Sequence, residues 1–465
     1  MSTTTAGRAL PRARWRLSRR IGFWAIALSF FVLTAFSTAP SSLYGLYEHH
    51  EHLAPLTITV VYAVYAAGTV ISLLLAGHLS DSYGRRPVLI PALAIAVVAA
   101  FVFLTWRSLV GLLIARMLTG VALGAAVATA TAFLTDLDSG ASGTPTRRSG
   151  IVSTVANVGG LAVGPLLAGL LARYEPDPLR LPFLVLLAAL IAAMALAFIA
   201  PEGHPAARPR PAYHPQRLRA PAGARGQFIA GTTAAFLSFA VFGLFGGLAG
   251  RFLAGPLHHY SPALTGLTIF LCFGSGVIAQ TTTIGWPIHR LLAAAIVPVM
   301  TGLCALVLSA WTSPPSLVLF LIGAVVAGAG CGAIFRGGLT LVISTANADD
   351  RAGALATFFT AGYAGISLPV IGLGVALQHL SPRLTLLIFG LAIGLGILAA
   401  APALLRPLPD AAEPSEPDSD PMTTMSCCFG GGSGDRDGAP VPPRATDPPL
   451  DAKPILTAHR RPPIR

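Results

Sequence analysis

Long apolar runs separated by short polar segments fill most of the chain, from about residue 21 to residue 405. Each run holds roughly 20 residues, and a helix of that length, rising about 1.5 Å per residue, crosses a hydrocarbon layer of about 30 Å. The pattern therefore predicts an all-α polytopic membrane protein with twelve transmembrane helices. Their expected bounds are residues 21–46, 54–77, 87–106, 108–134, 150–172, 181–200, 227–250, 262–284, 288–311, 315–345, 353–377 and 384–405.

A polar segment rich in proline and arginine, residues 201–226, interrupts this pattern after the sixth predicted helix. We interpret it as a cytoplasmic linker between two halves, residues 21–200 and 227–405. A basic cytoplasmic segment, residues 1–20, precedes the first half. Residues 406–465 are rich in Pro, Gly, Asp and Ser and hold few large apolar side chains, so we expect a disordered cytoplasmic tail.

Equivalent helices of the two halves share a short motif. The fifth helix opens with Arg-Ser-Gly at 148–150 and the eleventh with Arg-Ala-Gly at 351–353, and each has an interior proline, Pro165 and Pro369. A recurrence at matching positions indicates a duplicated six-helix unit. The chain is then expected to form two pseudo-symmetric six-helix bundles around a cavity near the membrane midplane.

Composition and charge exclude a soluble enzyme. Hydrophobic residues make up 54% of the chain and charged residues 11%, with a mean hydropathy of +0.70. Of the 31 basic residues, 24 fall in segments that the twelve helices place on one side and five on the other. This asymmetry predicts a multi-pass protein of a bacterial cytoplasmic membrane with both termini in the cytoplasm. The net charge of +12 is thus an orientation signal facing the lipid bilayer, and no nucleic-acid partner is expected.

A charged motif of the form G-x-x-x-D-x-x-G-R-R occupies the loop between the second and third helices. Its defining residues are Gly77, Asp81, Gly84, Arg85 and Arg86. The glycines permit a tight turn, and Asp81 can cap a helix or face the N-terminus of a neighbouring helix. Arg85 can pair with a carboxylate at the cytoplasmic end of the fourth helix, where Asp136 and Asp138 are available.

This motif, in a chain of twelve helices split six and six, resembles the signature of the major facilitator superfamily. The resemblance covers about residues 20–405 and implies the major facilitator fold and transport by alternating access. It also implies that Asp81 and Arg85, with Asp136, form a gate that stabilises the outward-facing state. A loop whose arginines only set the topology remains the alternative. The matching loop of the second half, residues 285–290, lacks the aspartate, which puts a second latch in doubt.

One face of the fourth helix carries Arg116, Gly120 and Gly124. Small residues at this spacing allow a neighbouring helix to pack closely. A buried arginine costs about 2.5–3.5 kcal/mol even on the lenient insertion scale, so Arg116 needs partners. The pattern resembles the family's fourth-helix motif, which implies a contact with the first helix and a part in proton movement. A structural role, with Arg116 binding carbonyls where residues 37–40 disturb the first helix, is an equal alternative.

The fifth helix carries a second glycine motif around a proline. Its residues are Gly160, Gly164, Pro165 and Gly169. Proline bends a helix, and the glycines give a smooth face for a partner helix. The pattern resembles G-x-x-x-G-P-x-x-G-G, the antiporter motif of drug exporters in the superfamily, with Ala168 in place of the penultimate glycine. The resemblance favours proton-driven export over uptake.

The cargo and the coupling residue are less clearly marked. No acidic residue falls at the centre of a predicted helix, and the nearest carboxylates, Glu48 and Glu51, lie in a His-rich outer loop. The substrate-cavity candidates are polar, aromatic or charged side chains within helices: Tyr65, Asn157, Gln280, Arg336 and Tyr363. An arginine in the cavity would favour an anionic substrate, although Arg336 can also reach the membrane interface from the end of its helix.

These patterns together predict a secondary active transporter that exports small amphipathic compounds, with protons as the coupling ion. The alternative is a proton-coupled transporter of a small metabolite, including an anionic one. A membrane enzyme would need a cluster of His, Asp or Ser at the membrane face, and a sensor would need a folded soluble domain; the sequence indicates neither. We therefore expect no catalytic residue, metal site or cofactor, and a chain that acts as a monomer.

Overall fold

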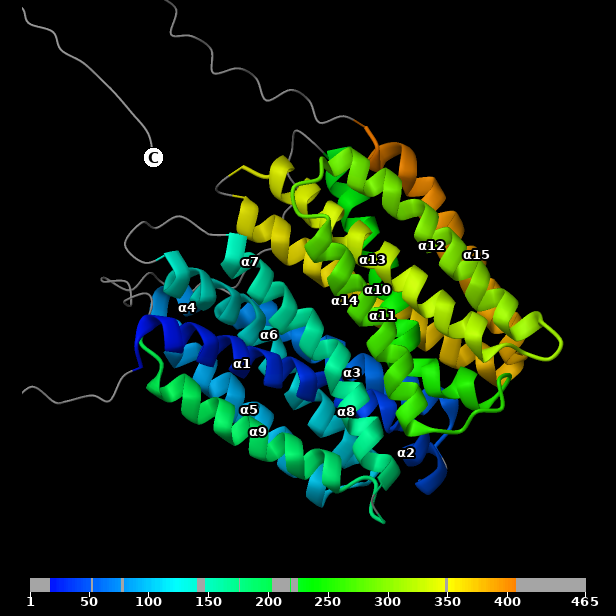
Figure 1. The fold of residues 1–465 in the computed structure, drawn as a ribbon, viewed down its shortest axis with the longest axis horizontal. Helices are drawn as coiled ribbons and strands as arrows, with labels where there is room; N and C mark the ends of the chain where they lie inside the picture. Colours follow the sequence, from blue (N-terminus) through cyan, green and yellow to red (C-terminus); the bar gives the residue numbers. More distant parts are fainter. Residues whose placement is uncertain are drawn as a thin grey trace, which may run out of the picture. The chain divides into compact units, whose positions relative to one another are not determined.

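The computed structural model is helical throughout the part of the chain that it describes. Twelve of its helices are long and apolar enough to cross a membrane, as the hydropathy pattern predicts (Figure 1). The expected N-terminal segment up to residue 16, nearly all of the linker and the tail after residue 406 lie outside the described residues. The structure describes residues 17–51, 53–76, 79–139, 147–174, 176–202, 218, 225–347 and 350–406.

The first half supplies six spans, of which the first and the fifth are interrupted. Its elements are α1 (Arg19–Thr38), η1 (Ala39–Ser42), α2 (Tyr44–His50), α3 (Pro55–Ala76), α4 (Leu79–Tyr83), α5 (Arg86–Thr105), α6 (Leu109–Ser139), α7 (Arg147–Thr154), η3 (Val155–Gly159), α8 (Gly160–Tyr174) and α9 (Leu181–Ile199). The helix α6 continues five residues past its expected end at residue 134, because hydropathy detects only the apolar part of a helix. The extra turn carries Asp136 and Asp138.

The second half supplies six uninterrupted spans. They are α10 (Arg225–Ala254), α11 (Pro262–Thr282), α12 (Ile288–Trp311), α13 (Leu317–Thr345), α14 (Arg351–His379) and α15 (Pro382–Leu404). Serine side chains fix several of the helix starts by accepting a hydrogen bond from the first turn. Ser261 accepts from the Leu264 amide at 3.3 Å and Ser316 from the Leu319 amide at 3.2 Å. These local signals explain why the expected starts agree with the structure.

Two irregular turns lie side by side in the first half. The first span leaves α-helical geometry at Ala39, where the 3₁₀ turn η1 begins with Pro40 as its second residue, and the fifth span contains the π-helical turn η3. Hydroxyl groups of α1 stabilise this turn: Thr34 Oγ1 donates to the Ala156 carbonyl at 2.8 Å and Thr38 Oγ1 to the Leu161 carbonyl at 2.9 Å. A side chain that inserts into a helical hydrogen-bond ladder changes its register, which accounts for the irregular turn of the fifth span. The first span is interrupted at η1, which contains Pro40.

Small residues allow the helices to pack closely within each half. A Cβ atom on Gly120 of α6 would lie 2.1 Å from the Tyr65 carbonyl oxygen of α3. A Cβ atom on Gly302 of α12 would lie 2.3 Å from the Ala327 amide of α13. Large apolar side chains such as Phe101 instead point outward, where lipid is their natural contact. Close helix packing with a lipid-facing apolar surface is typical of membrane bundles.

The loops after the second and eighth spans share an unusual backbone conformation. Gly84 has φ of 96° and Gly285 has φ of 94°, a left-handed region that residues with a side chain rarely adopt. The two glycines occupy equivalent places in the two halves. This geometric repeat accompanies the sequence repeat at residues 148–150 and 351–353 and is what a duplicated unit would give.

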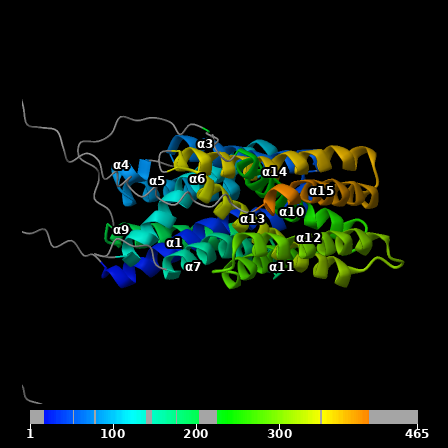
Figure 2. The ribbon, with the colours of Figure 1, turned by 90° about the horizontal axis from the view of Figure 1, so that it is seen from above.

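The two halves meet along a seam at which α8 packs against α11 and α3 against α14 (Figures 1 and 2). We call the two ends of the helices the Arg85 end and the Glu48 end. The seam is tightly packed at the Glu48 end. A Cβ atom on Gly169 would lie 2.3 Å from the Pro262 carbonyl oxygen, and one on Gly374 would lie 2.2 Å from Thr59 Oγ1.

Candidate functional site

A cavity of about 230 Å³ lies between the two halves, from the middle of the spans toward the Arg85 end. Four of the five side chains that the sequence predicts for the cavity, Tyr65, Asn157, Gln280 and Tyr363, are among those that line it. Asn157 belongs to the π-helical turn η3, so the irregular backbone of the fifth span brings this amide to the cavity. The lining also includes hydroxyl groups at the Arg85 end, such as Thr131 and Ser153.

Aromatic side chains of the second half form most of the apolar wall. The Phe239 ring lies 5.1 Å from Phe335 and 5.8 Å from Tyr363, and Phe242 lies 4.7 Å from Phe273, measured between ring centroids. None of the residues that line this cavity, all within the described chain, is charged. An apolar, aromatic pocket with a few amide and hydroxyl groups is suited to small amphipathic molecules.

Arg336, the fifth predicted cavity residue, is placed differently. Its Nη1 donates to the Gln280 carbonyl oxygen at 2.7 Å and to Thr283 Oγ1 at 3.0 Å. These acceptors lie at the C-terminal end of α11, where unpaired carbonyls favour a cation. Arg336 thus joins α13 to the end of α11, and it is not among the residues that line the cavity.

Arg116 of α6 is completely buried behind the cavity wall. Its Nη1 donates to the Ser37 carbonyl oxygen at 2.7 Å, at the disturbed end of α1. The guanidinium carbon lies 4.5 Å from the ring centroid of Tyr65, 5.7 Å from Tyr62 and 5.8 Å from Tyr44. This hydrogen bond to a carbonyl of the first helix is the kind of contact that the sequence suggested for Arg116. The aromatic cage was not foreseen, because its members are spread over α2 and α3.

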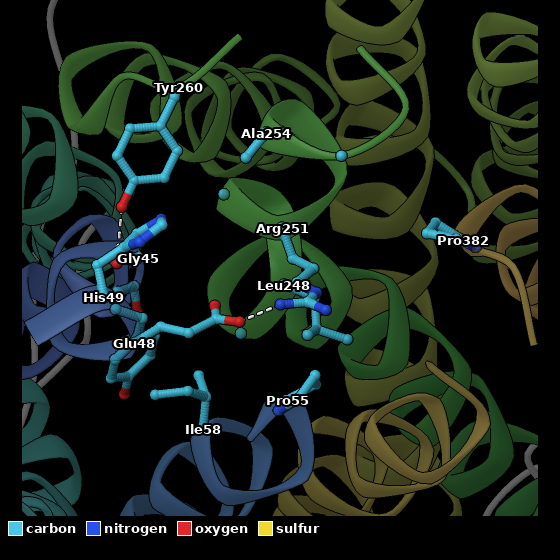
Figure 3. A pocket seen from close by; sticks show the side chains of 15 residues that line it. Gly45, Glu48, His49, Pro55, Ile58, Leu248, Arg251, Ala254, Tyr260 and Pro382 are labelled. Carbon is cyan, nitrogen blue, oxygen red and sulfur yellow. Dashed lines mark hydrogen bonds and ion pairs between the residues drawn. The ribbon is translucent and has the colours of Figure 1, made fainter. Parts of the chain in front are cut away.

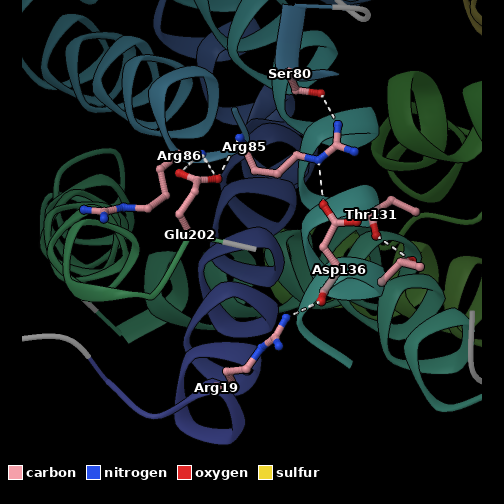
Figure 4. A network of polar contacts seen from close by, with 8 residues as sticks. Arg19, Ser80, Arg85, Arg86, Thr131, Asp136 and Glu202 are labelled. Carbon is pink, nitrogen blue, oxygen red and sulfur yellow. Dashed lines mark hydrogen bonds and ion pairs between the residues drawn. The ribbon is translucent and has the colours of Figure 1, made fainter. Parts of the chain in front are cut away.

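The charged motif builds a polar network at the Arg85 end (Figure 4). Arg85 is buried, and its Nε lies 2.9 Å from Asp136 Oδ2 while its Nη1 donates to Ser80 Oγ at 2.9 Å. Arg19 adds a hydrogen bond of 3.1 Å to the Asp136 carbonyl oxygen. The network therefore ties the start of α1 and the loop before α5 to the end of α6. Gly77 and the side chain of Asp81 lie outside the described residues.

Glu202, which sequence reasoning assigned to the linker, belongs to this network. Its carboxylate accepts the Arg85 amide at 2.9 Å and the Arg86 amide at 3.3 Å, at the N-terminus of α5 (Figure 4). An acidic group there satisfies unpaired amides and the positive end of the helix. Arg86 in turn hydrogen-bonds the Phe198 carbonyl oxygen at the end of α9. Glu202 lies more than 100 residues from these partners, and no local pattern marks it.

The glycine and proline motif of the fifth span lies where α8 is held between α1 and the second half. A Cβ atom on Gly164 would lie 1.9 Å from the Ala35 carbonyl oxygen of α1. Across the seam, a Cβ atom on Gly266 of α11 would lie 2.3 Å from the Pro165 carbonyl oxygen. A Cβ atom on Gly160 would lie 2.0 Å from Thr34 Oγ1 of α1. The motif thus permits backbone contact on both sides of α8.

A second cavity, of about 390 Å³, lies at the Glu48 end between α2, α3 and α10 (Figure 3). Glu48 of α2 forms an ion pair with Arg251 of α10, and this pair joins the two halves. Tyr260 donates to the Gly45 carbonyl oxygen at 2.8 Å, and its ring lies 4.6 Å from that of His49. Burial raises the pKa of Tyr260, and the nearby Glu48 carboxylate adds to the rise. We call this set the outer latch.

The sequence placed Glu48 in a His-rich outer loop. The structure shows a short helix that contacts the second half. Among the described residues, no group of three or more His, Cys, Asp or Glu side chains is placed to hold a metal ion.

Comparison with known proteins identifies the architecture. The family model described as Major Facilitator Superfamily matches residues 23–322. A bacillibactin exporter of Bacillus subtilis (strain 168) is 31% identical over 122 residues, which is 25% of this chain and 30% of that protein. The matched segment thus spans less than a third of that relative.

Solved structures share the fold at low sequence identity. A mutant of nucleoside transporter NupG has a TM-score of 0.62 at 14% identity, covering 83% of this chain and all of that one. The human organic anion transporter MFSD10 has a TM-score of 0.58 at 18% sequence identity, and the match covers 84% of this chain and 100% of that chain. A bacterial homologue of the human lysosomal transporter Spinster, in an inward-facing and occupied conformation, has a TM-score of 0.59 at 16% sequence identity. The match covers 82% of this chain and 95% of that chain.

Proposed function

Because this chain belongs to the major facilitator superfamily and is a multi-pass membrane transporter of small molecules, we propose that it exports small amphipathic compounds in exchange for protons. The observation that carries the proposal is the aromatic cavity between the two halves. Its wall offers large apolar surfaces, and its polar groups are amides and hydroxyls that can orient a cargo without binding a charge strongly.

The distribution of basic residues supports an orientation with the Arg85 end in the cytoplasm. The central cavity lies toward this end, whereas the seam is packed at the Glu48 end. The described conformation is then the inward-facing one, in which cargo enters from the cytoplasm. Transport proceeds by rocking of two bundles, residues 21–200 and 227–405, about the cavity.

Two polar clusters regulate this exchange in the proposed mechanism. The outer latch of Glu48, Arg251 and Tyr260 stabilises the inward-facing state, because its contacts cross the seam. The network of Arg85 and Asp136, together with Asp81, stabilises the outward-facing state, as the family resemblance implies. The Glu48 latch crosses the seam, whereas the contacts of Arg85 given above lie within the first half, so the gating role of Arg85 in this mechanism rests on the family resemblance.

Export and proton coupling draw on two further observations. The motif at residues 160–169 resembles that of proton-driven drug exporters, and the relative with 31% identity is itself an exporter. None of the described carboxylates lines the central cavity, whereas Glu48 lies in the outer latch. Protonation of Glu48 from outside would remove the charge that holds Arg251. We place the coupling step there.

Transport by the purified protein in liposomes tests this function. The probe is N-phenylnaphthylamine, a neutral aromatic amphiphile, with and without an imposed pH gradient. We expect movement of the probe against its gradient only when protons flow in the opposite direction. Transport that is independent of the pH gradient, or the lack of any transport across a panel of amphipathic probes, contradicts the proposal.

A matched pair of variants ties this transport to the cavity. Thr154 lines the cavity, whereas Thr340 is an exposed residue of α13. Thr154→Trp should fill the cavity and abolish transport, and Thr340→Trp should leave it unchanged. Equal transport by both variants would place the pathway elsewhere.

A second candidate is proton-coupled transport of an anionic metabolite. The observation that favours it is Arg116, a buried cation for which no ion pair forms among the described residues. The lining of the central cavity is itself neutral, so an anion in the cavity would depend on Arg116 for its counter-charge.

A further inference from the structure

The guanidinium of Arg116 has one edge without a hydrogen-bond partner among the described residues. Nη1 is used by the Ser37 carbonyl, but Nε and Nη2 are buried and unpaired. These two nitrogens form the side of the guanidinium that presents two parallel N–H donors. That arrangement matches the two oxygens of a carboxylate.

Other unpaired donors lie on the same side of the first half. The hydroxyl groups of Ser41 and Tyr44 are also buried and without a partner in the described chain. A cation with two free donors, beside two free hydroxyls, is the composition of an anion site.

Arg116 stands in the wall between the two cavities. Tyr62 and Tyr65, which cover its guanidinium from one side, line the central cavity. Ser41 and Tyr44 line the outer cavity. Arg116 lines neither cavity in this conformation, so a molecule in the central cavity reaches its free edge only if the rings of Tyr62 and Tyr65 move.

We propose that the free edge of Arg116 binds a carboxylate group of the cargo while the aromatic part of the same molecule occupies the central cavity. This inference rests on the proposed function and names the substrate class: amphipathic aromatic carboxylates. The paired donors fix the carboxylate, and the rings of Phe239, Phe242 and Phe335 pack against the aromatic part. The cavity wall contributes no negative charge that would repel such a molecule, as far as the described residues show.

Binding of small probes to the full-length protein in nanodiscs tests the inference. Sodium benzoate carries the ring and the carboxylate, benzamide carries the ring alone, and sodium acetate and sodium chloride supply an anion without the ring. We expect benzoate to raise the melting temperature in a saturable manner and to bind more tightly than the other three.

Substitutions then assign the binding to Arg116. Arg116→Lys keeps the charge but removes the paired donors, and we expect benzoate to bind about 10- to 100-fold more weakly while benzamide is unaffected. Should this variant not fold, Tyr44→Phe and Ser41→Ala decide the question. Each removes one hydroxyl, and benzoate should bind about 2- to 10-fold more weakly.

Two results would overturn the inference. One is benzoate binding that none of these substitutions changes. The other is binding of acetate or chloride as tight as that of benzoate, which would show a general anion site. The proposed function fails separately: it fails if benzoate binds through Arg116 but no compound is transported. If neutral amphiphiles are transported while benzoate binding does not depend on Arg116, the function stands and this inference falls.

Discussion

Removing the charge of Glu48 should shift the protein toward the outward-facing state. Glu48→Gln keeps the size of the side chain but abolishes its ion pair with Arg251. The two side chains are 22% and 37% exposed, so the pair lies between a surface pair and a buried one. We therefore estimate its contribution at about 0.5–1.4 kcal/mol, which corresponds to about a twofold to tenfold change in the ratio of the two states.

The rate at which a cysteine in the outer cavity reacts with a membrane-impermeant thiol reagent measures this ratio. Ile58 is 3% exposed and lines the outer cavity, so Ile58→Cys should react mainly when the Glu48 end opens. The five native cysteines are replaced by alanine to give a clean background. Reaction should be about 2- to 10-fold faster in Glu48→Gln than in the parent, because the rate is proportional to the open population.

Charge exchange separates the ion pair from other effects of substitution. Glu48→Arg alone brings two cations together and should open the outer end more than Glu48→Gln does. Adding Arg251→Glu restores an ion pair and should return the rate to within about twofold of the parent. Glu51 lies on the same segment but contacts His50, so Glu51→Gln is the matched control and should change little. The reasoning is refuted if Glu48→Gln leaves the rate unchanged, or if the exchanged pair reacts as fast as Glu48→Arg.

Three further predictions concern packing, the inner network and pH. Gly120→Ala should lower the free energy of unfolding by about 1–3 kcal/mol in a reversible unfolding assay, because its Cβ would overlap the α3 backbone. Gly150→Ala is the control and should be neutral, because the space around Gly150 is open. Arg85→Gln should favour the inward-facing state and slow probe export in liposomes by tenfold or more; unchanged export would argue against a gating role. The hydrogen bond from Arg107 at 2.7 Å lowers the pKa of Asp177, so its stabilising effect is present above the ordinary carboxyl pKa and is lost as the pH falls through the lowered value. The small difference in melting temperature between the parent and Asp177→Asn should accordingly vanish once the pH lies below the lowered pKa, and a difference that persists there would have another origin.

The sequence predicted the spans well because burial in a membrane is a property of each segment alone. Hydropathy is a local signal, and it placed all twelve spans within a few residues. The end of α6 was missed because Asp136 and Asp138 are polar although they are helical. The π-helical turn at Val155–Gly159 accepts a hydrogen bond from α1, and hydropathy does not report such a contact between distant segments.

The sequence predicted which polar side chains face the cavity, because that depends on the chemistry of each side chain alone. It did not predict contacts between segments that are far apart in the chain. Tyr65 and Asn157 line the cavity as expected, because polar and aromatic groups in a span avoid lipid. Glu202 and the partner of Glu48 were missed, since each contact joins residues more than 100 positions apart. Arg336 was expected in the cavity or at the membrane interface, and it instead hydrogen-bonds the end of α11.

Paired distance measurements at the two ends of the seam test alternating access about the central cavity most directly. Spin labels at Tyr174 and Arg383 report on the Glu48 end, and labels at Arg147 and Trp286 report on the Arg85 end; all four residues are exposed. On acidification, which in the proposed mechanism protonates Glu48, we predict that the outer distance lengthens as the inner distance shortens. Distances that change in the same direction, or that do not change under any combination of pH and probe, would contradict the account.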